Sequence, residues 1–163
     1  MLTDTLFPVK EYPANFAFNS EAGISDVKLD TGYKFIVRED TNKVLSCMTD
    51  EYKVVTNKEI VDTAVPILRK HNAELKESIS LGKGEKTIWK WVIPDIKIKV
   101  SEKDLLNPEI IIKNSYDGSE QVTILAGAFR LVCSNGLVIG VTLGQNNFKH
   151  NISNKNLDKL DEA

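Results

Sequence analysis

Residues 73–93, AELKESISLGKGEKTIWKWVI, contain the clearest alternation of apolar and polar side chains in the sequence. The alternation over 73–81 stops at a Gly-Lys-Gly-Glu turn and resumes over 87–93, a pattern that predicts a β-hairpin. In a strand, Trp89, Trp91 and Ile93 share one face and Lys90 lies on the other. The hairpin therefore has one apolar face and one mixed face.

A second hairpin and a helix are predicted before this stretch. YKFIVRE (33–39) and KVLSCM (43–48) are strand-like, the Glu-Asp-Thr-Asn segment at 39–42 has turn chemistry, and YKVVT (52–56) is expected to form a further strand. Thr56 and Glu59 make a capping box, so a helix begins there, with apolar residues recurring at three and four. Pro66 is expected to kink or divide that helix.

Further strands are predicted after the first hairpin. They cover residues 96–100, 109–113 and 122–128, and Asn135-Gly136 is either a type I′ hairpin turn or the end of a helix. The predicted fold class is α+β: an antiparallel β-sheet of hairpins with one principal α-helix packed on a face.

The two ends differ from the α+β domain, which is expected to span residues 31–150. Residues 1–30 show no sustained period and predict an extended N-terminal arm, which packs on its own domain or lies across a neighbouring subunit. Residues 151–163, with Ser153 as a candidate N-cap, predict a tail or short C-terminal helix.

Composition indicates a folded, cytoplasmic protein. The 163 residues are 42% hydrophobic and 27% charged, which is ordinary for one globular domain. We find neither a signal-peptide pattern at the N-terminus nor an apolar run of about 18 residues that could span a bilayer. Cys47 and Cys133 could pair, but buried, unpaired thiols are expected in a reducing compartment.

No catalytic, metal or cofactor site is predicted. His71 and His150 lie far apart in the sequence, and no cysteine pair has ligand spacing. Cys133 could serve as a nucleophile, but it follows Leu131-Val132 and is expected to be a packed core thiol. The chain is therefore expected not to be an enzyme.

Residues 114–119, NSYDGS, allow two interpretations. Successive backbone N–H groups at Asp117, Gly118 and Ser119 could cradle a phosphate, since glycine permits the required backbone angles. Alternatively, the segment is a tight turn between two strands, in which Asp and Asn side chains bond their own backbone.

Two sequence words resemble a known family. The first word comprises Asn114, Ser115, Tyr116, Asp117, Gly118 and Ser119, and the second includes Arg130, Cys133 and Asn135. Together they resemble the phage/plasmid-like proteins of unknown function, and a looser likeness covers about residues 33–150. The resemblance implies a phage, prophage or plasmid origin. Similar proteins commonly carry histidine where this chain has Tyr116, so a role that requires an imidazole is not expected here.

Single-stranded DNA is the predicted partner, although the net charge of −2 does not itself indicate a nucleic-acid binder. Such binders combine cationic grooves with aromatic faces. The candidate contacts are Lys76, Lys83, Lys86, Lys90, Lys97, Lys99, Lys103, Lys113 and Arg130. The order of a helix and then antiparallel strands is similar to that of phage single-strand annealing proteins, the Erf and Red-beta group. That resemblance implies a homo-oligomer active in strand annealing and recombination.

A protein-binding module is the alternative prediction. Such a module would inhibit or modulate a host factor in defence or replication through exposed aromatic side chains, and it would tolerate the net negative charge. Both functions imply action in the host cytoplasm.

Overall fold

The computed structural model describes residues 1–20, 23–99, 105–131 and 138–148, and within them it contains one α-helix and antiparallel β-sheets. The predicted α+β class is therefore confirmed. The elements are η1 (Leu2–Thr5), β1 (Val9–Ser20), β2 (Gly23–Arg38), β3 (Lys43–Thr49), α1 (Asn57–Lys70), β4 (Glu74–Leu81), β5 (Lys86–Val92), β6 (Ile98–Lys99), β7 (Leu105–Leu106), β8 (Glu109–Ser115), β9 (Val122–Leu131) and β10 (Val138–Phe148).

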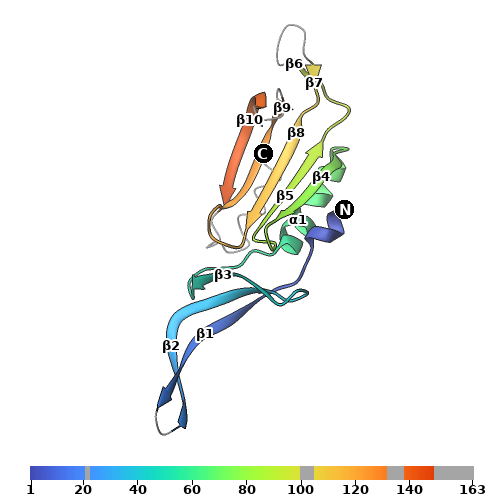
Figure 1. Cartoon of the computed structure of the whole chain (residues 1–163). Coiled ribbons are helices and arrows are strands. Elements are labelled where there is room, and N and C mark those ends of the chain that lie inside the picture. The colour runs from blue at the N-terminus through green and yellow to red at the C-terminus, as the bar shows by residue number, and fades with distance from the viewer. Residues whose placement is uncertain (21–22, 100–104, 132–137, 149–163) are drawn as a thin grey trace.

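The main sheet has five strands in the order β10-β9-β8-β5-β4, and α1 packs against one of its faces (Figure 1). The predicted hairpin at 73–93 forms β4 and β5, and Trp89 lies opposite Ile112 of β8. Trp89 is almost fully buried with Ile60 and Ala64 of α1. The apolar face of the hairpin thus forms the main core.

Helix α1 begins where the capping box predicts. The Glu59 backbone N–H donates to Thr56 Oγ1 at 3.2 Å, and the Glu59 carboxylate accepts from the Thr56 N–H at 2.7 Å. The helix runs through Pro66 to Lys70 without the expected division. Pro66 lies on the exposed side of the helix, so its ring displaces no core side chain.

Strands β1 and β2 form a long two-stranded arm, where the sequence predicts an extended arm over residues 1–30. β1 and β2 pair antiparallel and project away from the five-stranded sheet, with β3 beside β2 (Figure 1). The sequence shows no steady period here because the register of β1 shifts between Pro13 and Asn15 and again between Phe16 and Phe18. The expected boundary at residue 30 falls inside β2.

Two local expectations before α1 are wrong. Residues 52–56 form no strand, because Tyr52 and Val54 instead pack against a second core of Phe7, Ile36, Leu45 and Tyr116. Cys47 is exposed rather than buried, because its position in β3 lies on the outer face of the three-stranded sheet.

The later strands match the sequence better. β8 and β9 form at the predicted 109–113 and 122–128 runs, whereas the 96–100 run yields only the two-residue β6. Leu131 pairs with Val138, so β9 and β10 form a hairpin, although Asn135-Gly136 itself lies outside the described residues. The predicted C-terminal tail, 151–163, also lies outside them.

Asn57, the first residue of α1, is the centre of a buried polar network. Its Nδ2 donates to the Thr5 carbonyl at 2.7 Å and to Thr87 Oγ1 at 3.0 Å. Its Oδ1 accepts from Asn114 Nδ2 at 2.8 Å. Because Asn57 is fully buried, these bonds replace the hydration that the amide lost on folding.

Tyr116 links the same network to the three-stranded sheet. Its hydroxyl accepts from the Asn57 backbone N–H at 2.8 Å, and its backbone carbonyl accepts from Ser46 Oγ of β3 at 2.5 Å. Its ring lies 6.0 Å from that of Phe7, and burial raises the pKa of its phenol well above the ordinary value. Tyr116 therefore joins the two sheets as a neutral hydrogen-bonding group.

Replacing Asn57 by alanine should destabilise the domain strongly. The change leaves the Thr5 carbonyl and the Asn114 amide buried without their partner, at a cost of about 3 kcal/mol. Urea unfolding followed by circular dichroism measures this loss. Exposed Asn15→Ala is the matched control and should change the free energy of unfolding by less than about 0.5 kcal/mol. Equal effects of the two variants would contradict the network.

Tyr116→Phe should lower the free energy of unfolding by about 1–3 kcal/mol, because the Asn57 N–H loses its buried acceptor while the ring remains. Exposed Tyr33→Phe is the control and should have little effect. A Tyr116→Phe protein as stable as the parent would show that this bond contributes nothing.

Candidate nucleic-acid interface

The face of the five-stranded sheet opposite α1 has no described helix over it, and we call it the open face. Strand pairing determines which side chains lie there. Lys86 pairs with Ser115, Ile88 with Lys113, and Lys90 with Ile111, whereas Trp89 and Trp91 point to the α1 side. Lysines and half-buried aliphatic side chains therefore alternate across the open face.

Four of the predicted lysines meet on this face: Lys76, Lys86, Lys90 and Lys113. Three of them have carboxylate partners. Lys76 contacts Glu109 at 2.5 Å, Lys90 contacts Glu77 at 2.8 Å, and Lys86 contacts Glu120 at 3.5 Å. Lys113 makes no ion pair with a described residue. Three of the four lysines are thus matched by carboxylates, and Glu74, opposite Val92, adds a fourth carboxylate to the face.

The other predicted contacts lie elsewhere. Lys83 is in the β4–β5 turn, where its carbonyl accepts from Arg38, while Lys97 and Lys99 lie at the β6–β7 end of the molecule (Figure 1). Lys97 donates to Asn107 Oδ1 at 2.6 Å. Lys103 lies outside the described residues, and of Arg130 the structure describes only the backbone, opposite Ile139.

The first family word is a structural junction and a turn. Asn114, Ser115 and Tyr116 are buried, and Asp117 closes a turn by accepting from the Ser119 N–H at 2.9 Å and from the hydroxyls of Ser115 and Ser119. Partial burial raises the pKa of Asp117, but these hydrogen bonds outweigh it and hold the pKa below its ordinary value.

This geometry favours the turn over the phosphate cradle. The Ser119 N–H and both hydroxyls already donate to an ionised carboxylate, which would repel a phosphate. Gly118 has φ +71°, and a Cβ there would lie 2.7 Å from Met48 Cε. Glycine thus serves the turn and its contact with β3.

The structure does not bring the two family words together. Lys113 pairs with Thr123 near the start of β9, and Arg130 lies seven residues further along that strand, about 23 Å away at strand spacing. Cys133 and Asn135 lie outside the described residues. Asn114 and Arg130 therefore do not share one site.

Sequence reasoning missed an exposed aromatic surface on the outer face of the three-stranded sheet. Tyr12 lies opposite Phe35, and Tyr33, Phe35 and Val44 are each between 38% and 49% exposed. Lys10 Nζ lies 5.6 Å from the centre of the Tyr12 ring. The alternation in Tyr33-Lys34-Phe35 was the available signal, but an exposed aromatic row looks the same in sequence as a buried one.

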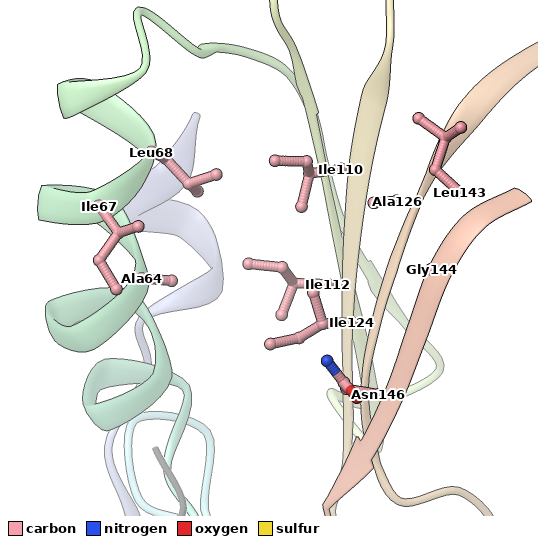
Figure 2. Close-up of a pocket in the computed structure, with 10 residues that line it drawn as sticks. All are labelled: Ala64, Ile67, Leu68, Ile110, Ile112, Ile124, Ala126, Leu143, Gly144 and Asn146. Atoms are coloured by element: carbon pink, nitrogen blue, oxygen red, sulfur yellow. The ribbon is translucent and has the colours of Figure 1, made fainter. Parts of the chain in front are cut away.

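An apolar groove lies on the α1 side of the sheet, between α1 and β8, β9 and β10 (Figure 2). It has a volume of about 280 Å³ and is lined by Ala64, Ile67, Leu68, Ile110, Ile112, Ile124, Ala126, Leu143, Gly144 and Asn146. Its lining offers only one side-chain amide and no ionisable group, which does not suit a phosphate.

Two other features are absent from the described residues. No helix there is both long and apolar enough to cross a membrane. No cluster of three or more histidine, cysteine, aspartate or glutamate side chains there is placed to hold a metal ion.

Comparison with known proteins identifies a family. The model of a domain of unknown function, DUF932, matches residues 44–162. Two Escherichia coli (strain K12) proteins, the UPF0380 proteins YfjQ and YafZ, are each 49% identical to this chain over 43 residues, which is 26% of this chain and 16% of each relative. The matched stretch is thus about a sixth of each relative's length, and no solved structure matches the chain. Because the family model covers most of the chain, this protein belongs to the DUF932 family, in agreement with its resemblance to phage/plasmid-like proteins of unknown function.

Proposed function

We propose that this domain binds single-stranded DNA on the open face of its five-stranded sheet. The strand register supports the proposal, because it gathers Lys86, Lys90 and Lys113 on the open face. Cations on adjacent strands lie about 5 Å apart in the pairing direction. That spacing suits a flexible strand whose phosphates follow the surface.

The existing ion pairs leave these cations available. In the Lys90–Glu77 and Lys86–Glu120 pairs, every side chain is more than a third exposed. Ion pairs that are this exposed contribute at most about 1 kcal/mol to stability. A polyanion that releases counterions competes readily with them. Lys76 differs because Glu109 is mostly buried, so Lys76 is held to neutralise that carboxylate.

Apolar surface between the lysines provides a place for bases. Ile88, Ile111 and Leu125 are half-buried on the open face, and Phe129, also half-buried, follows on the same side of β9. Trp89 and Trp91 take no part in stacking because both are buried beneath α1. Binding therefore depends mainly on phosphate contacts and is sensitive to salt.

Annealing and recombination are the activities that we propose for this binding. The element order, a helix followed by antiparallel strands, is similar to that of the Erf and Red-beta group, and the family match agrees with a phage or plasmid origin. We place this activity in the host cytoplasm, where single-stranded replication intermediates occur.

Replacing two lysines of the open face by glutamate should weaken oligonucleotide binding. We expect Lys90→Glu with Lys113→Glu to lower the affinity for a labelled single-stranded oligonucleotide at least about tenfold and to reduce the slope of log affinity against log salt by about 1.4. Fluorescence anisotropy at several salt concentrations measures both quantities.

The matched control is Lys58→Glu with Lys70→Glu, which makes the same charge change on α1, on the other side of the sheet. This control should bind more weakly than the parent only by the small effect of net charge. Lys97→Glu with Lys99→Glu tests the β6–β7 end. No binding by the parent at low salt, or equal losses in the open-face and α1 variants, would refute the proposal.

A protein-binding module remains the second candidate, and the exposed aromatic surface favours it. Tyr12, Tyr33 and Phe35 lie on a different sheet from the open-face lysines, and exposed aromatic clusters are typical of protein interfaces. The partner would be a host protein whose activity the domain modulates.

The double variant Tyr33→Ser with Phe35→Ser distinguishes protein binding at the aromatic surface from DNA binding at the open face. If the aromatic surface binds protein, the variant should retain oligonucleotide affinity within about twofold but lose a host protein that the parent retains on an affinity column. A large loss of oligonucleotide affinity would instead assign the aromatic surface to nucleic-acid binding.

A further inference from the structure

Strand β10 is an edge of the five-stranded sheet that lacks the usual protection against pairing. Its sequence, VIGVTLGQNNF, contains no charged residue and no proline over eleven residues. Exposed edges normally carry lysine, proline or inward-pointing charge, because their free N–H and C=O groups otherwise pair with another strand. Within the described residues, no strand occupies the outer side of β10.

The opposite edge of the same sheet provides an internal comparison. β4, with the sequence ELKESISL, carries Glu74, Lys76 and Glu77 within its first four residues. A second copy that paired there would place like charges near one another. The β4 edge thus carries charged side chains that oppose pairing with another strand, whereas the β10 edge carries none.

The apolar groove opens beside this unprotected edge. Leu143 of β10 is 59% exposed and lines the groove together with Ile67 of α1 and Ile124 of β9 (Figure 2). The register between β9 and β10 shifts between Thr142 and Gly144, so Leu143 is the extra residue of a bulge. Bulges redirect side chains, and here one places a large apolar side chain at the rim of the groove.

The one described helix is too narrow to cover this part of the sheet. Five strands at about 4.8 Å spacing extend across about 19 Å, whereas a helix with its side chains is about 10 Å wide. α1 packs on Trp89 and Trp91 of β5 and on Ile112 of β8. The α1-side surface of β9 and β10 is therefore only partly covered, and burying it would be favourable.

We propose that β10 pairs antiparallel with β10 of a second copy of this chain, so that the two five-stranded sheets continue into one another. Antiparallel pairing of a strand with itself is compatible with two-fold symmetry, in which both copies use the same surface. Such pairing centred on Leu143 places the two Leu143 side chains together, on the side of the two helices, and closes both grooves.

The size of this contact suits a specific dimer. Eleven paired residues extend about 36 Å and form about ten inter-strand hydrogen bonds, which is typical of a protein interface. The absence of charge in β10 removes repulsion between the identical strands. The inference does not depend on the proposed DNA binding, because it concerns the opposite side and edge of the sheet.

Sedimentation velocity of the purified chain without nucleic acid tests the proposal. We expect a monomer–dimer equilibrium that Leu143→Lys shifts toward monomer, raising the dissociation constant at least about tenfold, because the two lysines would meet across the symmetry axis. The matched control is Leu105→Lys, which changes a leucine that is 62% exposed in β7 and should leave the dimer intact. Circular dichroism verifies that each variant is folded.

Hydrogen exchange of the parent provides a measurement that requires no variant. Amides of β10 that do not bond to β9 should exchange more slowly at high than at low protein concentration, whereas amides of the β4 edge should not change. A monomer at every concentration, a dimer that Leu143→Lys leaves unchanged, or a dimer whose β10 amides gain no protection would overturn the proposal.

Discussion

The buried side chain of Asn57 holds three separate segments of the chain together. It is the first residue of α1, and it bonds to the N-terminal segment at Thr5, to β5 at Thr87 and to β8 at Asn114. A buried amide left without partners is costly, so the observed arrangement, which supplies all of them, is strongly favoured. The helix position, the sheet and the N-terminal segment are therefore set together.

Tyr116 extends this constraint to the three-stranded sheet. The same packing determines which side chains lie on the open face. With α1 held on one side by Asn57 and by the buried tryptophans, the alternating side chains of β5 and β8 leave their lysines on the other side. The candidate DNA surface is thus a product of core packing. In the proposed binding, the residues of the first family word have an indirect role, because they hold the strands that carry Lys86, Lys90 and Lys113.

Local patterns predicted a large part of this fold. The Thr56–Glu59 capping box and the 73–93 alternation depend on neighbours within a few residues, and both formed where expected. The common face of Lys86 and Lys90 follows from the same alternation. By contrast, an extended arm was predicted but the pairing of β1 with β2 was not, because the register shifts twice, near Pro13 and near Phe16, and each shift interrupts the period that a sequence can show.

Contacts between distant segments could not be predicted in the same way. Nothing near Asn57 in the sequence indicates that it bonds to Thr5, Thr87 and Asn114, which are up to 57 positions away. Similarly, pairing of Lys76 with Glu109 and exposure of Phe35 depend on which strands become neighbours. The predicted lysine set therefore divided into an open-face group and a distant group only when the strand order was known.

Lysine acetylation followed by mass spectrometry, with and without a single-stranded oligonucleotide at low salt, tests whether the open face binds DNA. If binding occurs there, the oligonucleotide should protect Lys86, Lys90 and Lys113, while Lys58 and Lys70 on α1 should react equally in both conditions. Protection confined to other lysines, or no protection at all, would contradict binding at the open face.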